Sequence, residues 1–209
     1  MKISLLFLFS CCTLIAYTQS VKVNPAIEWQ KSLGGTSYDF ANSIQQTKDG
    51  GYITAGGSWS NDNDVSGHHG TSYSDYWIVK LDSAGNIQWQ KSLGGSDFEY
   101  AYWIQQTKDG GYIIAGESSS KDGDVTNNHG SRDYWIVKLD SAGNIQWQKS
   151  LGGTLYDQAF CILQSNDGGY VIAGTSLSND GDVNNNHGGW DCWVVKLDSA
   201  GNMLWQKSL

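Results

Sequence analysis

Proline and charge are both scarce in this sequence of 209 residues, which has one proline and 16% charged side chains. A collagen-like chain would need abundant proline in a Gly-X-Y period, so that class is excluded. Disordered chains are poor in aromatic residues, whereas this one has 10 Trp and 11 Tyr, and it therefore folds. The 26 glycines together with these aromatics suit a tightly turned β-sheet protein.

Basic residues are also few, with 13 Lys and Arg against 21 Asp and Glu and a net charge of −8. Such a chain has no electrostatic means of holding nucleic acid or an anionic membrane surface, so both are excluded as main partners.

Long apolar runs are confined to the N-terminus. A short positive start, Met1-Lys2, precedes the largely apolar residues 3–15, and the sequence then turns polar. This is the pattern of a secretory signal peptide over residues 1–18 with cleavage after Thr18, followed by a short linker at 19–26. An uncleaved anchor is an alternative, although the run is short for a span. Lipidation at Cys11 is another, but bulky Phe9 stands where a small residue is usual.

The rest of the chain consists of three copies of one sequence repeat. The segment Ile27–Gly35 recurs from Ile87 and from Ile145, and Met203 begins a further copy, at offsets of 60, 58 and 58 residues. We therefore divide the chain into repeats at 27–86, 87–144 and 145–202, with 203–209 as the start of a truncated fourth repeat.

Each repeat predicts four short strands, which in the first copy lie at 41–47, 52–57, 76–81 and 87–93. The strand at 76–81 is apolar on both faces, which indicates a sheet covered on both sides. Four-stranded antiparallel sheets repeated every 58–60 residues are typical of β-propeller blades. We predict an all-β fold of such blades in an incomplete or open ring, with a β-solenoid as the rival.

Three blades are too few to close a propeller. The fourth-strand sequence also occurs four times, against three copies of the others. Our preferred hypothesis is an N-terminal fragment of a larger protein. The alternative is head-to-tail self-association of chains.

The repeats resemble a known family. Their pattern Asp-aromatic-Trp-Ile-Val-Lys-Leu-Asp-x-x-Gly-Asn-x-x-Trp-x-Lys-x-Leu-Gly-Gly, seen from Asp75 and Asp133, is similar to the seven-bladed-propeller-like or delta-60 repeats of secreted bacterial proteins. The resemblance covers residues 27–209. It implies an exported protein, secreted or on the outer surface of a Gram-negative bacterium that uses type IX secretion. The C-terminal sorting domain usual in that family does not occur in this sequence.

Part of the pattern is also similar to the tryptophan-docking repeat of quinoproteins, in which a Leu-Asp-x-x-x-Gly-x-x-x-Trp run locks neighbouring blades. This resemblance implies a structural wedge between blades and does not imply the quinone. The residues it assigns to that role are Trp29, Trp89, Trp147 and Trp205.

A polar loop with the pattern Asp-x-Asp-Val-x-x-x-His-Gly joins the second and third strands. Two carboxylates in a turn suit a hard cation such as calcium, but no Glu closes a twelve-residue calcium loop. An Asx-rich surface turn is the alternative. The candidate calcium ligands are Asp62, Asp64, Asp122, Asp124, Asp180 and Asp182.

The histidine of each loop (His69, His129 and His187) has no second ligand at zinc spacing, so we expect it to bond its loop to the next strand. Cys161 and Cys192 fall on the first and third strands of one sheet, about 10 Å apart, which is too far for a disulfide. We expect two buried thiols.

No nucleophile elbow, phosphate-binding loop or zinc-protease helix occurs, so we predict that the chain is not an enzyme. If the chain has a pair of glycosidase carboxylates, the candidates are the acids at the start of the first strands, Asp39, Glu99 and Asp157. A catalytic site should break the repeat symmetry, yet the departures Trp59, Glu117, Arg132 and Trp190 are scattered along the sequence.

We therefore expect a non-catalytic scaffold that binds a glycan or a protein, with Trp59 and Trp190 as candidate sugar-stacking residues and no cofactor beyond calcium. A purely structural spacer and a fragment of a propeller enzyme, glycosidase or quinoprotein, are the alternatives.

Overall fold

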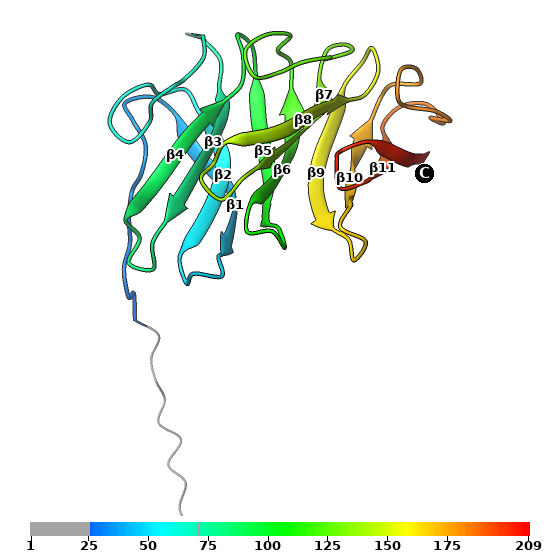
Figure 1. Ribbon diagram of the computed structural model, residues 1–209. Helices are drawn as coiled ribbons and strands as arrows, with labels where there is room; N and C mark the ends of the chain where they lie inside the picture. Colours follow the sequence, from blue (N-terminus) through cyan, green and yellow to red (C-terminus); the bar gives the residue numbers. More distant parts are fainter. Residues whose placement is uncertain (1–25, 71) are drawn as a thin grey trace, which may run out of the picture.

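The computed structural model describes residues 26–70 and 72–209, and the predicted signal peptide lies outside them. The described residues form twelve strands and no helix, as the sequence predicts (Figure 1). They make three sheets of four antiparallel strands in chain order, not closed into a ring. The strands are β1 (Asp39–Gln46), β2 (Tyr52–Ser58), β3 (Asp75–Leu81), β4 (Ile87–Leu93), β5 (Glu99–Gln106), β6 (Tyr112–Ser118), β7 (Asp133–Leu139), β8 (Ile145–Leu151), β9 (Asp157–Gln164), β10 (Tyr170–Ser176), β11 (Asp191–Leu197) and β12 (Met203–Ser208).

The four strands predicted for each repeat are therefore confirmed, with one exception. Residues 27–33 have almost the sequence of β4, yet they form no strand. A strand needs a paired neighbour, and among the described residues no sheet precedes β1 to supply one. Each sheet consequently runs from the middle of one sequence repeat into the start of the next, for example from Asp39 to Leu93.

The third strands of the first two sheets are buried on both faces, as their sequence indicates. All seven residues of β3 and of β7 are buried, including Lys80 and Lys138. The Lys80 ammonium donates to Asp49 Oδ2 at 2.9 Å, to the carbonyl of Leu81 at 3.0 Å and to Gln88 Oε1 at 3.0 Å. All three ammonium protons thus have partners, which is the condition for burying a lysine.

Successive sheets pack face to face. We call the side of a sheet that meets the following sheet its front face and the opposite side its rear face. At the first joint, front-face residues such as Tyr76, Ile78 and Leu93 share one core with rear-face residues such as Ile104 and Val137. The second joint repeats this arrangement with Tyr134, Ile136 and Leu151 against Ile162 and Val195.

A tryptophan of each fourth strand reaches across the joint. Trp89 of β4 lies edge-on to Tyr112 of the next sheet, with ring centroids 5.7 Å apart. The turn residue Gly143 packs against the same indole, where a Cβ would stand 3.0 Å from it, and its φ of 82° also requires glycine. Trp147 and Trp29 make the same contact with Tyr170 and Tyr52.

Trp205 is the fourth residue of this kind, on the front face of the third sheet. No sheet follows it in the described residues, and it is 48% exposed. The same open face explains a wrong expectation about the cysteines. Both are free, but neither is fully buried: Cys161 is half-buried, and Cys192 is exposed because its position corresponds to the joint residues Tyr76 and Tyr134. Within the described part of the chain there is no helical segment long and apolar enough to cross a bilayer.

Candidate functional site

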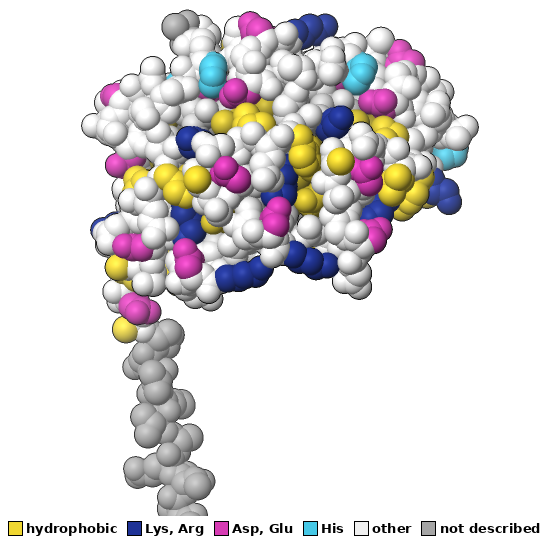
Figure 2. Space-filling model, in the orientation of Figure 1, with side chains coloured by type: hydrophobic (Ala, Val, Ile, Leu, Met, Phe, Trp, Pro, Cys, Tyr) yellow, Lys and Arg dark blue, Asp and Glu magenta, His cyan; other side chains and the backbone are white. Residues whose placement is uncertain are grey.

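The departures from repeat symmetry gather at one edge of the sheets, the upper edge in Figure 1, where the loops between second and third strands meet the Gly-Gly linkers between sheets. Figure 2 shows histidines near this edge with acidic side chains close by. The loop histidine and its acidic neighbours occur in all three repeats, and the residues that differ between repeats lie around them.

The Asp-x-Asp loops hold the linkers through the main chain. Gly94 donates its N–H to Asp124 Oδ2 at 3.2 Å, and Ser96 donates to Asp122 Oδ1 at 2.7 Å. The backbone and side-chain bonds from Ser96 lower the pKa of Asp122. The first and third loops repeat the pair, with Gly34 and Thr36 on Asp64 and Asp62, and Gly152 and Thr154 on Asp182 and Asp180.

This donor arrangement does not fit calcium. The carboxylates face N–H groups, which repel a cation, and the described residues contain no cluster of three or more His, Cys, Asp or Glu side chains able to hold a metal. The Asp-x-Asp pattern fixes the linker in place, which is closer to the turn alternative than to the cation site.

Each loop histidine bonds the loop to the following strand, as expected. His69 lies with its ring Nδ1 2.8 Å from Asp75 Oδ2 and donates its own N–H to the same oxygen at 2.7 Å. Asp75 is the first residue of β3 and is fully buried. His69 Nε2 also lies 3.7 Å from Asp124 Oδ2 of the next repeat, so this histidine spans the joint.

Buried carboxyl pairs lie directly beneath the histidines. Asp75 and Glu99 both border Gly94, and Asp133 and Asp157 both border Gly152. All four side chains belong to residues with 0% exposure. Asp75 Oδ1, Asp133 Oδ1 and Asp157 Oδ1 have no hydrogen-bond partner among the described residues.

The pKa values of these pairs are raised. Burial, with help from Asp75, raises the pKa of Glu99 to about 7, and burial raises that of Asp133 to about 6. Burial also raises the pKa of Asp75 and of Asp157. Asp191 occupies the position of Asp75 on the open front face, and there the N–H of His187 lowers its pKa. Covering by the neighbouring sheet is therefore what raises the pKa of these acids.

Two of the four departures from symmetry are brought together by the structure, which corrects the expectation that they are scattered. Arg132 Nη1 lies 2.9 Å from Glu117 Oε1. The same carboxylate accepts from Tyr102 Oη at 3.0 Å and from Gln158 Nε2 at 2.6 Å. Glu117 is 1% exposed, and burial together with this carboxylate raises the pKa of Tyr102.

The sequence contains a signal for this cluster. In the first repeat, Asn42, Gly57 and Ser74 stand where the second repeat has Tyr102, Glu117 and Arg132. The strand register pairs Tyr100 with Glu117 and Ser118 with Asp133, so departures on three adjacent strands meet. Comparing the repeats by register, rather than along the chain, would have found them.

Aromatic rings line the same edge from the first sheet to the third. Trp59 lies 5.7 Å from Tyr100, and Tyr100 lies 5.8 Å from Phe98 by ring centroids. The Arg132 guanidinium then sits 5.7 Å from the Phe98 ring and 5.6 Å from that of Tyr156. We call this set, with its further members Tyr38, Phe40 and Tyr73, the aromatic row.

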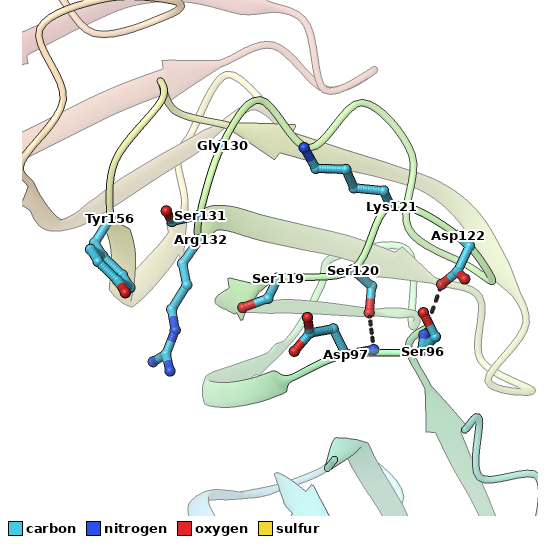
Figure 3. Close-up of a pocket in the computed structure, with 10 residues that line it drawn as sticks. All are labelled: Ser96, Asp97, Ser119, Ser120, Lys121, Asp122, Gly130, Ser131, Arg132 and Tyr156. Carbon is cyan, nitrogen blue, oxygen red and sulfur yellow. Dashed lines mark hydrogen bonds between the residues drawn. The ribbon is translucent and has the colours of Figure 1, made fainter. Parts of the chain in front are cut away.

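A polar pocket of about 620 Å³ adjoins the row (Figure 3). Arg132 and Tyr156 belong to both. The rest of the lining is Gly130 together with the hydroxyl, carboxylate and ammonium groups of Ser96, Asp97, Ser119, Ser120, Lys121, Asp122 and Ser131.

Trp59 and Trp190, the predicted sugar-stacking residues, are not brought together. Trp59 is half-buried within the aromatic row. Trp190 is 51% exposed and precedes β11 of the third sheet, with the second sheet between the two. The most exposed rings of the row are Tyr38 at 81% and Tyr156 at 43%, which sequence analysis did not single out.

Comparison with known proteins gives limited similarity. No protein-family model matches the chain. The chain is 27% identical over 185 residues to the regulatory protein FlaEY of Caulobacter vibrioides, covering 83% of this chain and 19% of that protein. It thus spans about a fifth of the length of the curated relative it matches.

Among solved structures, variants of an apocarotenoid oxygenase from Synechocystis align with 79% of this chain and 37% of theirs, for example at 13% identity and a TM-score of 0.43. A Bacteroides caccae protein of unknown function aligns with 81% of this chain and 67% of its own, at 14% identity and a TM-score of 0.26. Scores this low carry no functional argument, and the fold rests on the strand pairing described above.

Proposed function

We propose that this protein is an exported, non-catalytic binding module whose upper edge binds a glycan. The observation that supports this is the aromatic row continuing into a polar pocket of about 620 Å³. A sugar ring has an apolar C–H face and a rim of hydroxyl groups, so it needs an apolar platform beside hydrogen-bonding groups. Tyrosine offers a flat apolar ring with a polar end, and convergent polar groups fix ligand orientation.

Arg132 joins the two parts of this site. Its guanidinium is held between the rings of Phe98 and Tyr156 and by the buried carboxylate of Glu117. A donor fixed in this way loses little freedom when it binds a hydroxyl or carboxylate of a ligand. The second repeat alone carries this arrangement, so we place the centre of the site there.

A non-catalytic role is favoured over a glycosidase because of where the acids lie. Glu99 and Asp157 are fully buried beneath the joints, and Asp122 accepts from the main chain. Among the described residues, no feature supports the spacer or the propeller-enzyme hypothesis as directly as the aromatic row supports ligand binding. Export rests on residues 1–18 and on the family resemblance.

Binding is tested by titrating the purified chain with a panel of soluble neutral and acidic polysaccharides. At least one should bind, and Tyr156→Ala should weaken it about tenfold, as expected for loss of one stacking ring. Leu204→Ala removes an exposed apolar side chain (59%, against 43% for Tyr156) from the outer strand β12 and is the control. No binding by the parent chain refutes the proposal, and release of reducing ends would make it an enzyme. Trp190→Ala tests the remaining predicted contact.

Export has its own test. Expressed with its leader in a Gram-negative host, the chain should leave the cytoplasm with Gln19 as its first residue. Retention in the cytoplasm with Met1 intact would refute it.

A further inference from the structure

The polar pocket beside the aromatic row contains two cationic side chains that the other repeats lack. Lys121 and Arg132 both line it, and both belong to the loop between β6 and β7 (Figure 3). Arg132 is the only arginine of the chain, and Lys121 is the only lysine after residue 26 that has no counterpart in another repeat. The two basic residues that break the repeat symmetry therefore line one pocket.

Arg132 is positioned to bind an anion. Its Nη1 lies 2.9 Å from Glu117 Oε1, and its guanidinium lies between the rings of Phe98 and Tyr156. An arginine has five N–H donors, so this ion pair leaves others for a ligand. The side chain is 28% exposed and lines the pocket. A planar guanidinium held in this way binds a carboxylate through two parallel hydrogen bonds.

Lys121 adds a second positive charge to the same pocket. Its side chain is exposed, and it forms no ion pair with a described residue. An ammonium on a flexible stem adapts to the position of an anion, whereas the guanidinium fixes its orientation. The hydroxyl groups of Ser119 and Ser131 also line the pocket and supply neutral donors.

The acidic side chains near these cations have partners of their own. Asp122 Oδ1 accepts from the N–H of Ser96 at 2.7 Å, and Asp97 Oδ1 accepts from the N–H of Phe98 at 2.8 Å. Glu117 is buried behind the guanidinium and is absent from the lining of the pocket. The local charge that a ligand meets is therefore set mainly by the two cations.

The charge of the whole chain limits how many negative charges the ligand can carry. The net charge is −8, so a polyanion that extends along the surface is repelled. Electrostatic interactions are screened over about 8 Å at physiological ionic strength, so a single carboxylate inside the pocket responds chiefly to the cations beside it. The charges thus favour an isolated carboxylate over a polyanion.

We propose that the ligand of this pocket is a short glycan with one carboxylate, such as a uronic or sialic acid next to a neutral sugar. The carboxylate pairs with Arg132 and Lys121, and the neutral sugar stacks on Tyr156. The pocket volume of about 620 Å³ lies within the range of about 300–1,000 Å³ that small ligands occupy. This inference rests on the proposed glycan binding and specifies the chemical class of the glycan.

The test is a calorimetric titration of acidic oligosaccharides and of the same oligosaccharides with the carboxylate reduced to an alcohol. The probes are sialyllactose, a xylotetraose with one glucuronate branch and a hyaluronan disaccharide, which carry one carboxylate each. At least one should bind, and reduction should weaken its binding about tenfold or more, because a charge-assisted pair is lost.

The outcomes separate this inference from the proposed function. Equal binding of the acidic and reduced forms overturns the inference and leaves glycan binding intact. Binding of neutral polysaccharides without binding of any acidic probe does the same. If no glycan of either kind binds, both proposals are refuted.

A substitution taken from the other repeats tests where the carboxylate lies. Lys121→Asn introduces the residue found at Asn61 and Asn179, so the loop retains a sequence that the fold accepts. It should lower the preference for the acidic form over the reduced form about fivefold. Lys207→Asn removes the same charge from an exposed position on the outer strand β12 and should leave the preference unchanged. A preference that Lys121→Asn does not alter overturns the inference.

Two further variants distinguish charge from stacking. Asp97→Ser introduces the residue of the first repeat at Ser37 and removes a negative charge from the lining, so it should strengthen binding of the acidic form about threefold. Tyr156→Ala should weaken the acidic and reduced forms by the same factor, since the ring contacts the neutral sugar. Weaker binding of the acidic form by Asp97→Ser would overturn the inference, because Asp97 would then be a ligand contact.

Discussion

The phenol of Tyr76 donates a hydrogen bond of 2.9 Å to the main-chain carbonyl of Trp135, across the joint between the first two sheets. Gly116 leaves the space for the phenol, because a Cβ at this position would stand 2.5 Å from the Tyr76 oxygen. Gly116 and its counterpart Gly174 thus make room for the tyrosine of the preceding sheet, and a Cβ at either would also stand 1.9 Å from a carbonyl of the adjacent first strand. Burial, with Glu99 and Glu117 nearby, raises the pKa of Tyr76, so its hydroxyl remains a donor.

Tyr76→Phe should lower the free energy of unfolding by about 1 kcal/mol, because it removes one buried hydrogen bond and leaves the carbonyl without its partner. Urea unfolding at neutral pH measures this change. Tyr38→Phe deletes the same atom from a ring that is 81% exposed and should change stability by much less. Equal effects of the two substitutions would show that the bond across the joint contributes nothing.

Stability should fall as pH rises from 5 to 8. The pKa of Glu99 is raised from 4.5 to about 7 in the folded chain, so its stabilising contribution is complete below its unfolded pKa and is lost as pH rises through 7. A change of this size corresponds to about 3 kcal/mol. Asp133, raised to about 6, acts in the same direction. Asp109 has a pKa of about 2, because its bonds to Thr107 and Lys138 outweigh burial, so its effect lies below pH 4.

Glu99→Gln should flatten this dependence and raise stability at pH 8, since the amide stays neutral and can donate toward the unpartnered oxygen of Asp75. Glu28→Gln, the same change at an exposed position, should leave the profile unaltered. Thermal unfolding at each pH from 5 to 8 gives the comparison. A parent chain that is more stable at pH 8 than at pH 5 would contradict the assignment of a raised pKa.

The fold could be predicted closely from the sequence because the same pattern of strands and turns occurs in all three repeats. The short apolar run Tyr76–Leu81 and the Gly-Gly turns determine strands and hairpins locally. What sequence did not predict is set by contacts between sheets. Residues 27–33 form no strand because no described strand lies beside them to pair with. Cys192 is exposed because no described sheet covers the front face of the third sheet.

The site was harder to predict for the same reason. Glu117 and Arg132 are 15 residues apart in sequence and meet only through the strand register. Tyr156 gains its role from Arg132, which belongs to the preceding sheet. The Asp-x-Asp loops suggested a cation site because the carboxylates can be identified from sequence. The main-chain N–H groups that face these carboxylates become apparent only in the structure.

The ion pair between Arg132 and Glu117 should be strongly coupled. Arg132→Ser, which restores the residue of the first repeat at Ser74, should cost about 3 kcal/mol because it leaves a buried carboxylate without its cation. Adding Glu117→Thr, the residue of the third repeat at Thr175, should recover part of that loss. Urea unfolding of both single variants and the double variant measures the coupling, and purely additive effects would show that the pair does not act as a unit.

The tryptophans of the fourth strands offer a matched pair of substitutions, one inside a joint between sheets and one on an open face. Trp89→Ala should cost about 3 kcal/mol or more, because the indole packs on Tyr112 and on Gly143 inside one chain. Trp205→Ala changes the equivalent residue on the open front face, where no following sheet covers the ring, so unfolding of the dilute monomer should be affected far less. If both substitutions destabilise the dilute chain equally, the tryptophans act within their own sheets. If Trp89→Ala alone destabilises the chain, the tryptophan acts as a wedge between its own sheet and the next, because the indole stabilises the fold only where a following sheet covers it.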